Sequence, residues 1–127
     1  MAKRLRLVLD ACVIIEYLNG DVQEDSLNIK ELVETCDCFV HCLQALEVIC
    51  HGARMQGKDG ANAVLKQLNN MPITISRSMS NGLLKQATEL KRVSGVPIID
   101  SICAAYANSI LAQVITMDSV DFPKLGP

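Results

Sequence analysis

The sequence predicts an α/β domain built on a mainly parallel sheet of about four strands, with helices packed against it. Short apolar runs suited to buried strands alternate along the chain with segments whose apolar residues recur at helical spacing. This alternation favours a parallel sheet, because parallel neighbours need a crossover between them. The 127 residues are 50% hydrophobic and 20% charged, so we expect residues 1–127 to form a single globular domain with one core.

Four short apolar segments are expected to form the strands. Leu5–Leu9 is apolar except at Arg6, and Phe39–Leu43 is a second apolar run. Both suit a sheet that is covered on its two faces. Two shorter segments, Ile73–Ile75 and Val114–Thr116, complete the predicted sheet.

Helical spacing of apolar residues marks the segments between the strands. The first helix, over Val13–Leu18, should stop at Asn19-Gly20, because glycine readily ends a helix. The last should run from about Ile99 to Ala112, with a buried apolar stripe. Four more are expected around Ile29–Val33, Leu46–Ala53, Ala61–Leu68 and Leu83–Leu90.

The apolar runs are far shorter than the ~20 residues of a membrane span, and no export signal is apparent, so we expect a cytoplasmic protein without a membrane segment. The net charge of −2 gives no overall attraction to nucleic acid, so binding would need a local basic patch or bound cations. Basic residues could contact phosphates near an acidic edge or could simply be solvated. These are Lys3, Arg4, Arg6, Arg54 and Lys58.

Three acids follow predicted strands. Asp10 comes directly after the first strand, Glu47 lies one helical turn after the second, and Asp118 comes two residues after Thr116. Ligands of open parallel sheets bind beyond the carboxyl ends of the strands, so these side chains should meet at one edge.

Asp100 is the fourth acid expected at this edge. It opens the last predicted helix, and its side chain should point into the fold because it heads an inward stripe. That stripe continues with Ala104, Ala107 and Leu111.

Four gathered carboxylates suit a hard divalent cation and phosphodiester hydrolysis. Ionised carboxylates among apolar neighbours are costly unless they are paired or bind a cation. Mg²⁺ and Mn²⁺ accept carboxylate oxygens, and Mg²⁺ also keeps waters and binds phosphate. Such a metal can lower the pKa of an attacking water and stabilise the leaving alkoxide without a protein nucleophile.

Each acid also has a purely structural interpretation. Asp10 could cap the helix that follows, and Asp100 would favour the helix dipole in any first turn. Glu47 could pair with His51 at i+4, and Asp118 could only shape a turn. The convergence of four acids on one edge is stronger evidence than any one of them.

The six cysteines are expected to be free thiols, because disulfides are rare in a reducing compartment. A zinc site is weakly suggested by the cluster of Cys36, Cys38, Cys42, Cys50, His41 and His51. The spacing of Cys36 and Cys38 is tighter than that of a usual zinc pair. Packing as small hydrophobic side chains is the better account.

Two stretches of the chain form a recognisable pattern. The first is Leu7-Val8-Leu9-Asp10 with the apolar segment Val13–Leu18. The second and more specific one runs from Pro97-Ile98-Ile99-Asp100 through Ala104-Ala105 to Thr116-Met117-Asp118 and Phe122. In these motifs the chain resembles the PIN domains, and among them the small VapC-type toxins of prokaryotic toxin–antitoxin pairs, over nearly its whole length.

The resemblance implies a PIN-like three-layer domain whose mainly parallel central sheet of about four strands is flanked by helices. Four strands are expected because the chain ends before the last edge strand usual in the family. It also implies that Asp10, Glu47, Asp100 and Asp118 bind Mg²⁺ or Mn²⁺ and cut RNA, and that Thr116 supports this acidic cluster. A homodimer and a VapB-like antitoxin partner are further expectations from the family.

The chain departs from the family at positions near two of the acids. Family members commonly have Ser or Thr shortly after the first Asp and again before the Glu. Those places hold Ala11, Cys12, Gln44 and Ala45 here.

Three classes of function therefore compete. The missing hydroxyl groups keep open a PIN-like interaction module without catalysis. A receiver-like signalling module would need paired acids after the first strand and a late-strand lysine, and the sequence has neither. Retention of all four acids favours a metal-dependent endoribonuclease, the toxin of a type II toxin–antitoxin pair.

Overall fold

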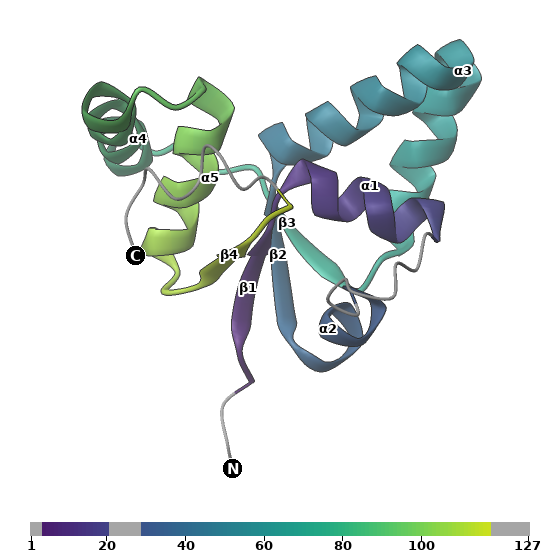
Figure 1. The fold of residues 1–127 in the computed structure, drawn as a ribbon, viewed down its shortest axis with the longest axis horizontal. Coiled ribbons are helices and arrows are strands. Elements are labelled where there is room, and N and C mark those ends of the chain that lie inside the picture. The colour runs from purple at the N-terminus through teal and green to yellow at the C-terminus, as the bar shows by residue number, and fades with distance from the viewer. Residues whose placement is uncertain (1–3, 21–28, 118–127) are drawn as a thin grey trace.

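The computed structural model describes residues 4–20 and 29–117, and these residues form a four-stranded parallel sheet (Figure 1). The strands are β1 (Arg6–Leu9), β2 (Asp37–His41), β3 (Ile73–Ser76) and β4 (Gln113–Ile115). They lie in the order β3-β2-β1-β4, with every neighbouring pair parallel. The predicted parallel sheet of about four strands is confirmed.

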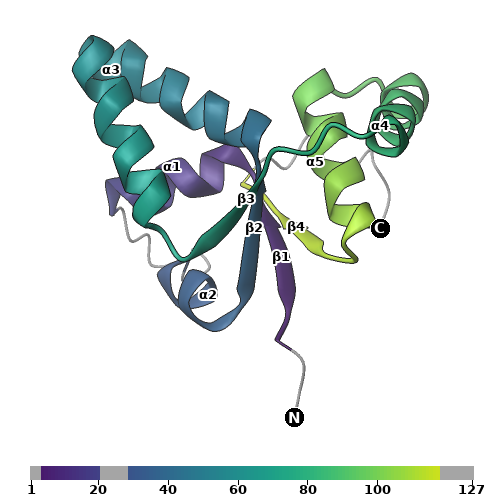
Figure 2. The same ribbon diagram turned by 180° about the vertical axis from the view of Figure 1, so that it is seen from behind.

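Helices cover both faces of this sheet, which gives the expected three layers (Figures 1 and 2). One side carries the first three helices, α1 (Ala11–Asn19), α2 (Ile29–Thr35) and α3 (Cys42–Asn70). The other side carries α4 (Asn81–Ser94) and α5 (Ile98–Ser109), which pack against each other. None of the helices in the described ranges combines the length and apolar character needed to cross a bilayer.

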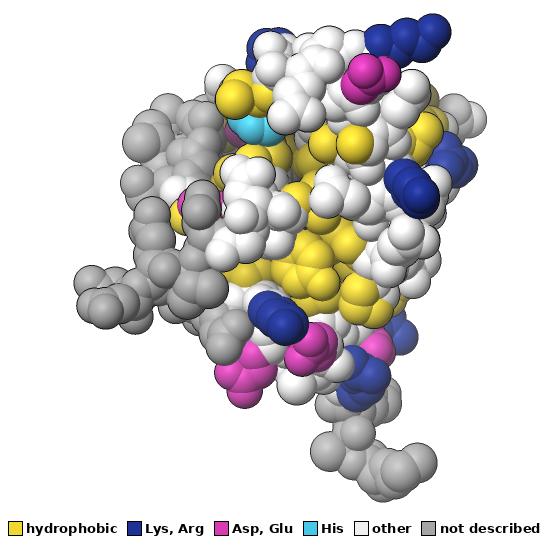
Figure 3. Space-filling view, turned by 90° about the vertical axis from the view of Figure 1, so that its right-hand side faces the viewer, with side chains coloured by type: hydrophobic (Ala, Val, Ile, Leu, Met, Phe, Trp, Pro, Cys, Tyr) yellow, Lys and Arg dark blue, Asp and Glu magenta, His cyan; other side chains and the backbone are white. Residues whose placement is uncertain are grey.

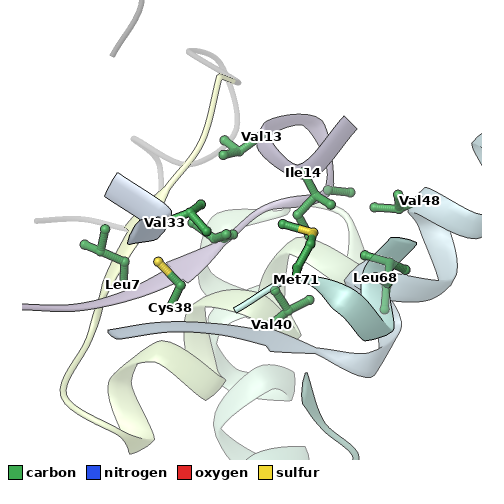
Figure 4. Close-up of a cluster of buried hydrophobic side chains, with 12 residues drawn as sticks. Leu7, Val13, Ile14, Val33, Cys38, Val40, Val48, Leu68 and Met71 are labelled. Carbon is green, nitrogen blue, oxygen red and sulfur yellow. The ribbon is translucent and has the colours of Figure 1, made fainter. Parts of the chain in front are cut away.

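The apolar residues form one buried cluster on each face of the sheet rather than a single core. Side chains alternate along β1, so Leu7 and Leu9 join the cluster under α1 and α3, and Val8 joins the cluster under α4 and α5. Figure 4 shows the first cluster, in which Ile14, Val40 and other small aliphatic side chains interlock. Both faces of the sheet are covered, so side chains on both sides of a strand can be buried. This explains why the strands are nearly continuous apolar runs in the sequence.

Two predicted element boundaries are wrong. The apolar run 39–43 was expected to be one strand, but β2 ends at His41 and α3 begins at Cys42. Strand and helix positions cannot be separated by apolarity alone in so short a run. The last helix ends at Ser109 instead of Ala112, and Leu111 has a positive φ of 55° and is 89% exposed. Leu111 therefore does not belong to the buried stripe that was expected to follow Asp100.

The two helices expected over 46–53 and 61–68 are the two arms of α3. The arms meet at a kink where Gln56 and Gly57 leave the helical region, and Gly57 has a φ of 62°. Beside the kink the arms approach so closely that a Cβ built on Gly60 would overlap the carbonyl oxygen of Gly52. Glycine at both positions lets the arms pack backbone to backbone, which brings the long α3 back towards the sheet.

Candidate active site

Asp10 lies at the carboxyl end of β1, where it is 93% buried and begins α1. Its Oδ1 accepts a hydrogen bond of 2.8 Å from the backbone N–H of Ala11, so the capping role weighed from the sequence is real. The cap uses only Oδ1 and does not involve Oδ2.

The second oxygen of Asp10 is held by side chains from two elements. The Thr116 hydroxyl, directly after β4, donates to Oδ2 over 3.0 Å. The Cys12 thiol donates to the same oxygen over 3.2 Å and accepts a hydrogen bond of 3.3 Å from the N–H of Met117. Because β4 is the neighbour of β1 in the sheet, residues about 105 positions apart in sequence close around one carboxylate.

Glu47 lies in the second turn of α3 with its side chain exposed. Partial burial raises the pKa of Glu47, the like charge of Asp10 raises it further, and the Arg54 guanidinium lowers it. The two carboxylates are thus close enough to repel each other. Among the ion pairs of residues 4–20 and 29–117 there is none between Glu47 and His51, so that structural interpretation lacks support.

Asp100 lies in the first turn of α5, partly buried, as the dipole interpretation predicted. Cys103, one turn later on α5, is fully buried. The pKa of this thiol is raised, first by burial and then by the charges of Asp10, Asp100 and Glu47. Three of the four predicted acids therefore lie near enough to the Cys103 thiol to raise its pKa, which places them in the same part of the structure. Asp118 lies outside the described residues.

The carboxylate oxygens of these acids are of the type that a hard divalent cation binds. Carboxylate oxygens are the ligands that Mg²⁺ and Mn²⁺ prefer, and a cation would relieve the repulsion between Asp10 and Glu47. Within the described ranges, no three His, Cys, Asp or Glu side chains converge closely enough to hold a metal ion by themselves. Mg²⁺ needs fewer, because it commonly keeps several waters and binds through one or two carboxylates.

Gln44 is a buried polar residue close to these acids that sequence reasoning noted only as a departure from the family. Its Nε2 donates to the carbonyl oxygen of Ile99 over 3.0 Å and so ties α3 to the start of α5, next to Asp100. Its Oε1 is buried without a hydrogen-bond partner among the described residues. A bound water or ion would satisfy this oxygen.

His41 was missed as a positioning residue, because the sequence suggested it only as a zinc ligand. It caps α3: its Nδ1 accepts from the N–H of Leu43 over 3.2 Å, and its Nε2 is 2.8 Å from the carbonyl oxygen of Ser78. Those partners require the tautomer protonated on Nε2. The ring also meets Tyr106 edge to face at 5.6 Å. The sequence signal was a polar residue in the middle of the apolar run 39–43.

Three of the cysteines considered as zinc ligands lie in different surroundings. Cys38 is buried in the first cluster, Cys42 starts α3, and Cys50 is exposed on the same helix. All six cysteines are unpaired in the structure.

Of the two interpretations of the N-terminal arginines, contact with phosphates near the acidic edge is not supported by their positions. Arg4 and Arg6 lie at the amino edge of the sheet, where Arg4 forms an ion pair of 3.3 Å with Asp37. Arg6 donates to the carbonyl oxygen of Ile110 over 3.0 Å. Arg54 is the predicted basic residue whose charge reaches the acidic site, through Glu47. Lys58 is exposed beyond the kink of α3, and Lys3 lies outside the described residues.

A groove of about 380 Å³ lies beside the acidic site, between α1 and the two arms of α3. Figure 3 shows hydrophobic side chains gathered in a hollow on this face. Its walls include Ile15, Leu18, Val48 and Val64. His51 also lines the groove and lies one turn after Glu47 on the same side of α3, so the groove adjoins Glu47.

The sequence model of the PIN domain family matches residues 7–126, and the chain belongs to this family. No curated protein matches the chain in sequence.

Several solved structures share the fold at low sequence identity. The toxin VapC20 of Mycobacterium tuberculosis, described as cleaving the sarcin–ricin loop, is 18% identical with a TM-score of 0.72, over 94% of this chain and 95% of its own. VapBC2 of Rickettsia felis, bound to a promoter DNA fragment, is 14% identical with a TM-score of 0.73, over 96% and 94%. FitAcB of Neisseria gonorrhoeae is 16% identical with a TM-score of 0.71, over 94% and 92%.

Proposed function

We propose that this protein is a Mg²⁺- or Mn²⁺-dependent endoribonuclease and the toxin of a toxin–antitoxin pair. The observation that carries the proposal is the shared electrostatic neighbourhood of Asp10, Glu47 and Asp100 at the carboxyl edge of a PIN-domain sheet. Asp118, two residues beyond Thr116, is proposed as the fourth acid of the site. The similarity to a toxin described as cleaving an RNA loop supports RNA as the substrate.

The residues of the site divide into a fixed part and a more exposed part. Asp10 is fixed, because both of its carboxylate oxygens accept hydrogen bonds from the protein. Glu47 is exposed, and its carboxylate can orient an attacking water. Arg54, close enough to lower the pKa of Glu47, can neutralise part of a phosphodiester at the same place.

A bound Mg²⁺ or Mn²⁺ would supply an activated water and neutralise charge on the phosphate. Asp10, Glu47, Asp100 and Asp118 are the residues that would hold it. A metal held in this way offsets the net negative charge of the protein, which otherwise opposes the approach of RNA.

The antitoxin partner is proposed from the structural neighbours, several of which are toxin–antitoxin complexes. The apolar groove between α1 and α3 supports a protein partner, because a chain lying in it would pass beside Glu47 and shield the site. A homodimer acting in the cytoplasm completes the proposal. Inhibition of cleavage by the protein encoded in the adjacent reading frame would support the pair, and unchanged cleavage at saturating partner would contradict it.

The test of the nuclease compares Asp100→Asn with Asp59→Asn, which changes an exposed acid on the second arm of α3. Purified protein should cleave RNA only with Mg²⁺ or Mn²⁺ present. Asp100→Asn should reduce cleavage by roughly a hundredfold or more, because a neutral amide is a poorer metal ligand and stabilises less charge. Asp59→Asn should keep the parent rate.

Melting temperatures separate this function from a structural role of Asp100. Mn²⁺ should raise the melting temperature of the parent and of Asp59→Asn but not that of Asp100→Asn, since only a bound ligand stabilises the folded state. Without metal, Asp100→Asn should melt at the parent temperature or above it, because one charge is removed from a repulsive cluster. If Asp100→Asn and Asp100→Ala both cleave at the parent rate and both melt earlier than the parent, the charge of Asp100 only stabilises the first turn of α5. A parent that neither binds metal nor cleaves RNA would favour the interaction module.

A further inference from the structure

We propose that the Cys12 thiol is a positioning residue of the acidic site, which holds the Asp10 carboxylate through a hydrogen bond to its Oδ2. The inference deepens the proposed nuclease function and rests on it for its consequence, although the hydrogen bonds on which it depends are independent of catalysis. It concerns a residue that by type alone would be assigned to packing.

The position of Cys12 is defined by two hydrogen bonds and one further contact. In the first turn of α1, its Sγ lies 3.2 Å from Asp10 Oδ2 and 3.8 Å from Thr116 Oγ1. The N–H of Met117 donates to the same sulfur over 3.3 Å. The thiol therefore connects the start of α1 with the backbone that leaves β4.

These contacts determine the direction of the S–H bond. The Met117 N–H can only donate, so it occupies a lone pair of the sulfur and leaves the S–H for an acceptor. Asp10 Oδ2 is the ionisable acceptor within reach. The chain of donors thus runs from Met117 through Cys12 to Asp10, and it needs the thiol in its protonated form.

The hydrogen bonds of Asp10 leave one direction for a ligand. A carboxylate accepts at about four lone-pair sites. Three are used by the Ala11 N–H, the Thr116 hydroxyl and the Cys12 thiol. With the donors of residues 4–20 and 29–117 counted, about one site remains, so these three donors fix the direction in which Asp10 presents its charge. A serine hydroxyl at position 12 could make the same two bonds, whereas an aliphatic side chain could make neither.

The competing account is that Cys12 only fills space, since it packs partly buried against the first apolar cluster. Cys12→Val and Cys12→Ser separate the two accounts. Valine keeps an apolar side chain of similar size and removes both hydrogen bonds, whereas serine keeps a donor and an acceptor and is less apolar. Packing predicts that valine is tolerated better than serine, and positioning predicts the reverse. Cys50→Val and Cys50→Ser, at an exposed cysteine of α3, are the matched controls.

The first measurement is amide hydrogen exchange in the metal-free protein, followed by NMR. The Ala11 and Met117 amides should exchange at least tenfold faster in Cys12→Val than in Cys12→Ser, which should match the parent. The Ala11 amide reports on Asp10 because it donates to Oδ1. Equal exchange of both amides in Cys12→Val and the parent would overturn the proposal, whatever the protein does to RNA.

The second measurement is Mn²⁺ affinity by titration calorimetry, together with RNA cleavage. Groups that orient metal ligands typically change metal affinity by about ten- to a hundredfold when removed. Cys12→Val should therefore weaken Mn²⁺ binding at least tenfold, and Cys12→Ser should restore it to within about threefold of the parent. Parent-like Mn²⁺ affinity in Cys12→Val with weaker binding in Cys12→Ser would overturn the positioning role. If the parent binds no Mn²⁺, the nuclease proposal fails and the exchange measurement alone decides the role of Cys12.

Discussion

At the carboxyl end of β1 the Asp10 carboxylate accepts hydrogen bonds from three groups, whereas at the amino end the guanidinium groups of Arg4 and Arg6 donate to backbone carbonyl oxygens. At the amino edge, opposite charges also pair directly, in the contact between Arg4 and Asp37. At the carboxyl edge, like charges meet, and the pKa of Glu47 is raised in part by Asp10.

This difference shows that the charges are balanced at the amino edge of the sheet and unbalanced at the carboxyl edge. The arginines of the amino edge are used in holding the N-terminal segment to α2 and to the end of α5. The carboxyl edge has an excess of negative charge that Arg54 only partly offsets. The carboxyl edge therefore suits a bound cation, and charge-removing substitutions at the two edges should differ in their effects: loss of an acid at the carboxyl edge should lower activity, whereas loss of an arginine at the amino edge should lower stability.

The largest effect is expected for Glu47→Gln at the carboxyl edge. RNA cleavage should fall by roughly a hundredfold, because the variant loses a charged group of the metal site. Glu34→Gln, an exposed acid of α2 on the amino-edge side, should leave cleavage unchanged. Parent-like cleavage by Glu47→Gln would remove this residue from the site.

The same variant should show a defined dependence of stability on pH. A raised pKa means that the fold disfavours the charged form of Glu47, so its contribution to stability is present in acid and is lost as the pH rises through the folded pKa. Glu47→Gln should therefore melt at or above the parent temperature at neutral pH, and this advantage should disappear below about pH 4. Melting curves of the metal-free proteins across this range measure it.

The next effect concerns a residue at the carboxyl edge whose role is structural. His41→Ala should lower the free energy of unfolding by about 3 kcal/mol, because it removes the cap of α3 and the bond to Ser78 and leaves a cavity beside Tyr106. His41→Asn should recover about 1 kcal/mol, since an amide oxygen can cap the helix. Urea unfolding of both variants tests this, and equal losses would show that the cap contributes little.

Local features of the chain were predictable where a single residue type determines the backbone conformation. Gly20 ends α1 with a φ of 67°, as the Asn19-Gly20 pair predicted. The apolar runs became the strands because both faces of the sheet are covered. The boundary between β2 and α3 was not predictable, because His41 caps the helix with a ring nitrogen where Ser, Thr, Asp or Asn would have marked the start.

The acidic site was predictable as a set of residues but not as a set of contacts. The topology places Asp10 and Glu47 after neighbouring strands, which is enough to expect them close together. The bond from the Met117 N–H to Cys12 and the bond from Thr116 to Asp10 depend on the register between β1 and β4, which no local pattern specifies. The phosphate-contact interpretation of Arg4 fails for a simpler reason, since a basic residue before a strand lies at the edge opposite to the acid that follows the strand.

The smallest effect is expected at the amino edge. Arg4→Ala should lower the free energy of unfolding by about 1 kcal/mol, because Arg4 is half exposed and its bonds to carbonyl oxygens of Glu34, Thr35 and Cys36 are partly replaced by water. Arg4→Lys should recover little of this loss, since an ammonium group cannot reproduce the planar fork that reaches several acceptors at once. Cleavage per folded molecule and its dependence on salt should match the parent, because the arginine lies at the edge away from the acids. Urea unfolding and cleavage at several salt concentrations measure both properties. A loss of RNA affinity in Arg4→Ala with unchanged stability would show that the amino edge also contacts the substrate, and the contrast between the two edges would then be wrong.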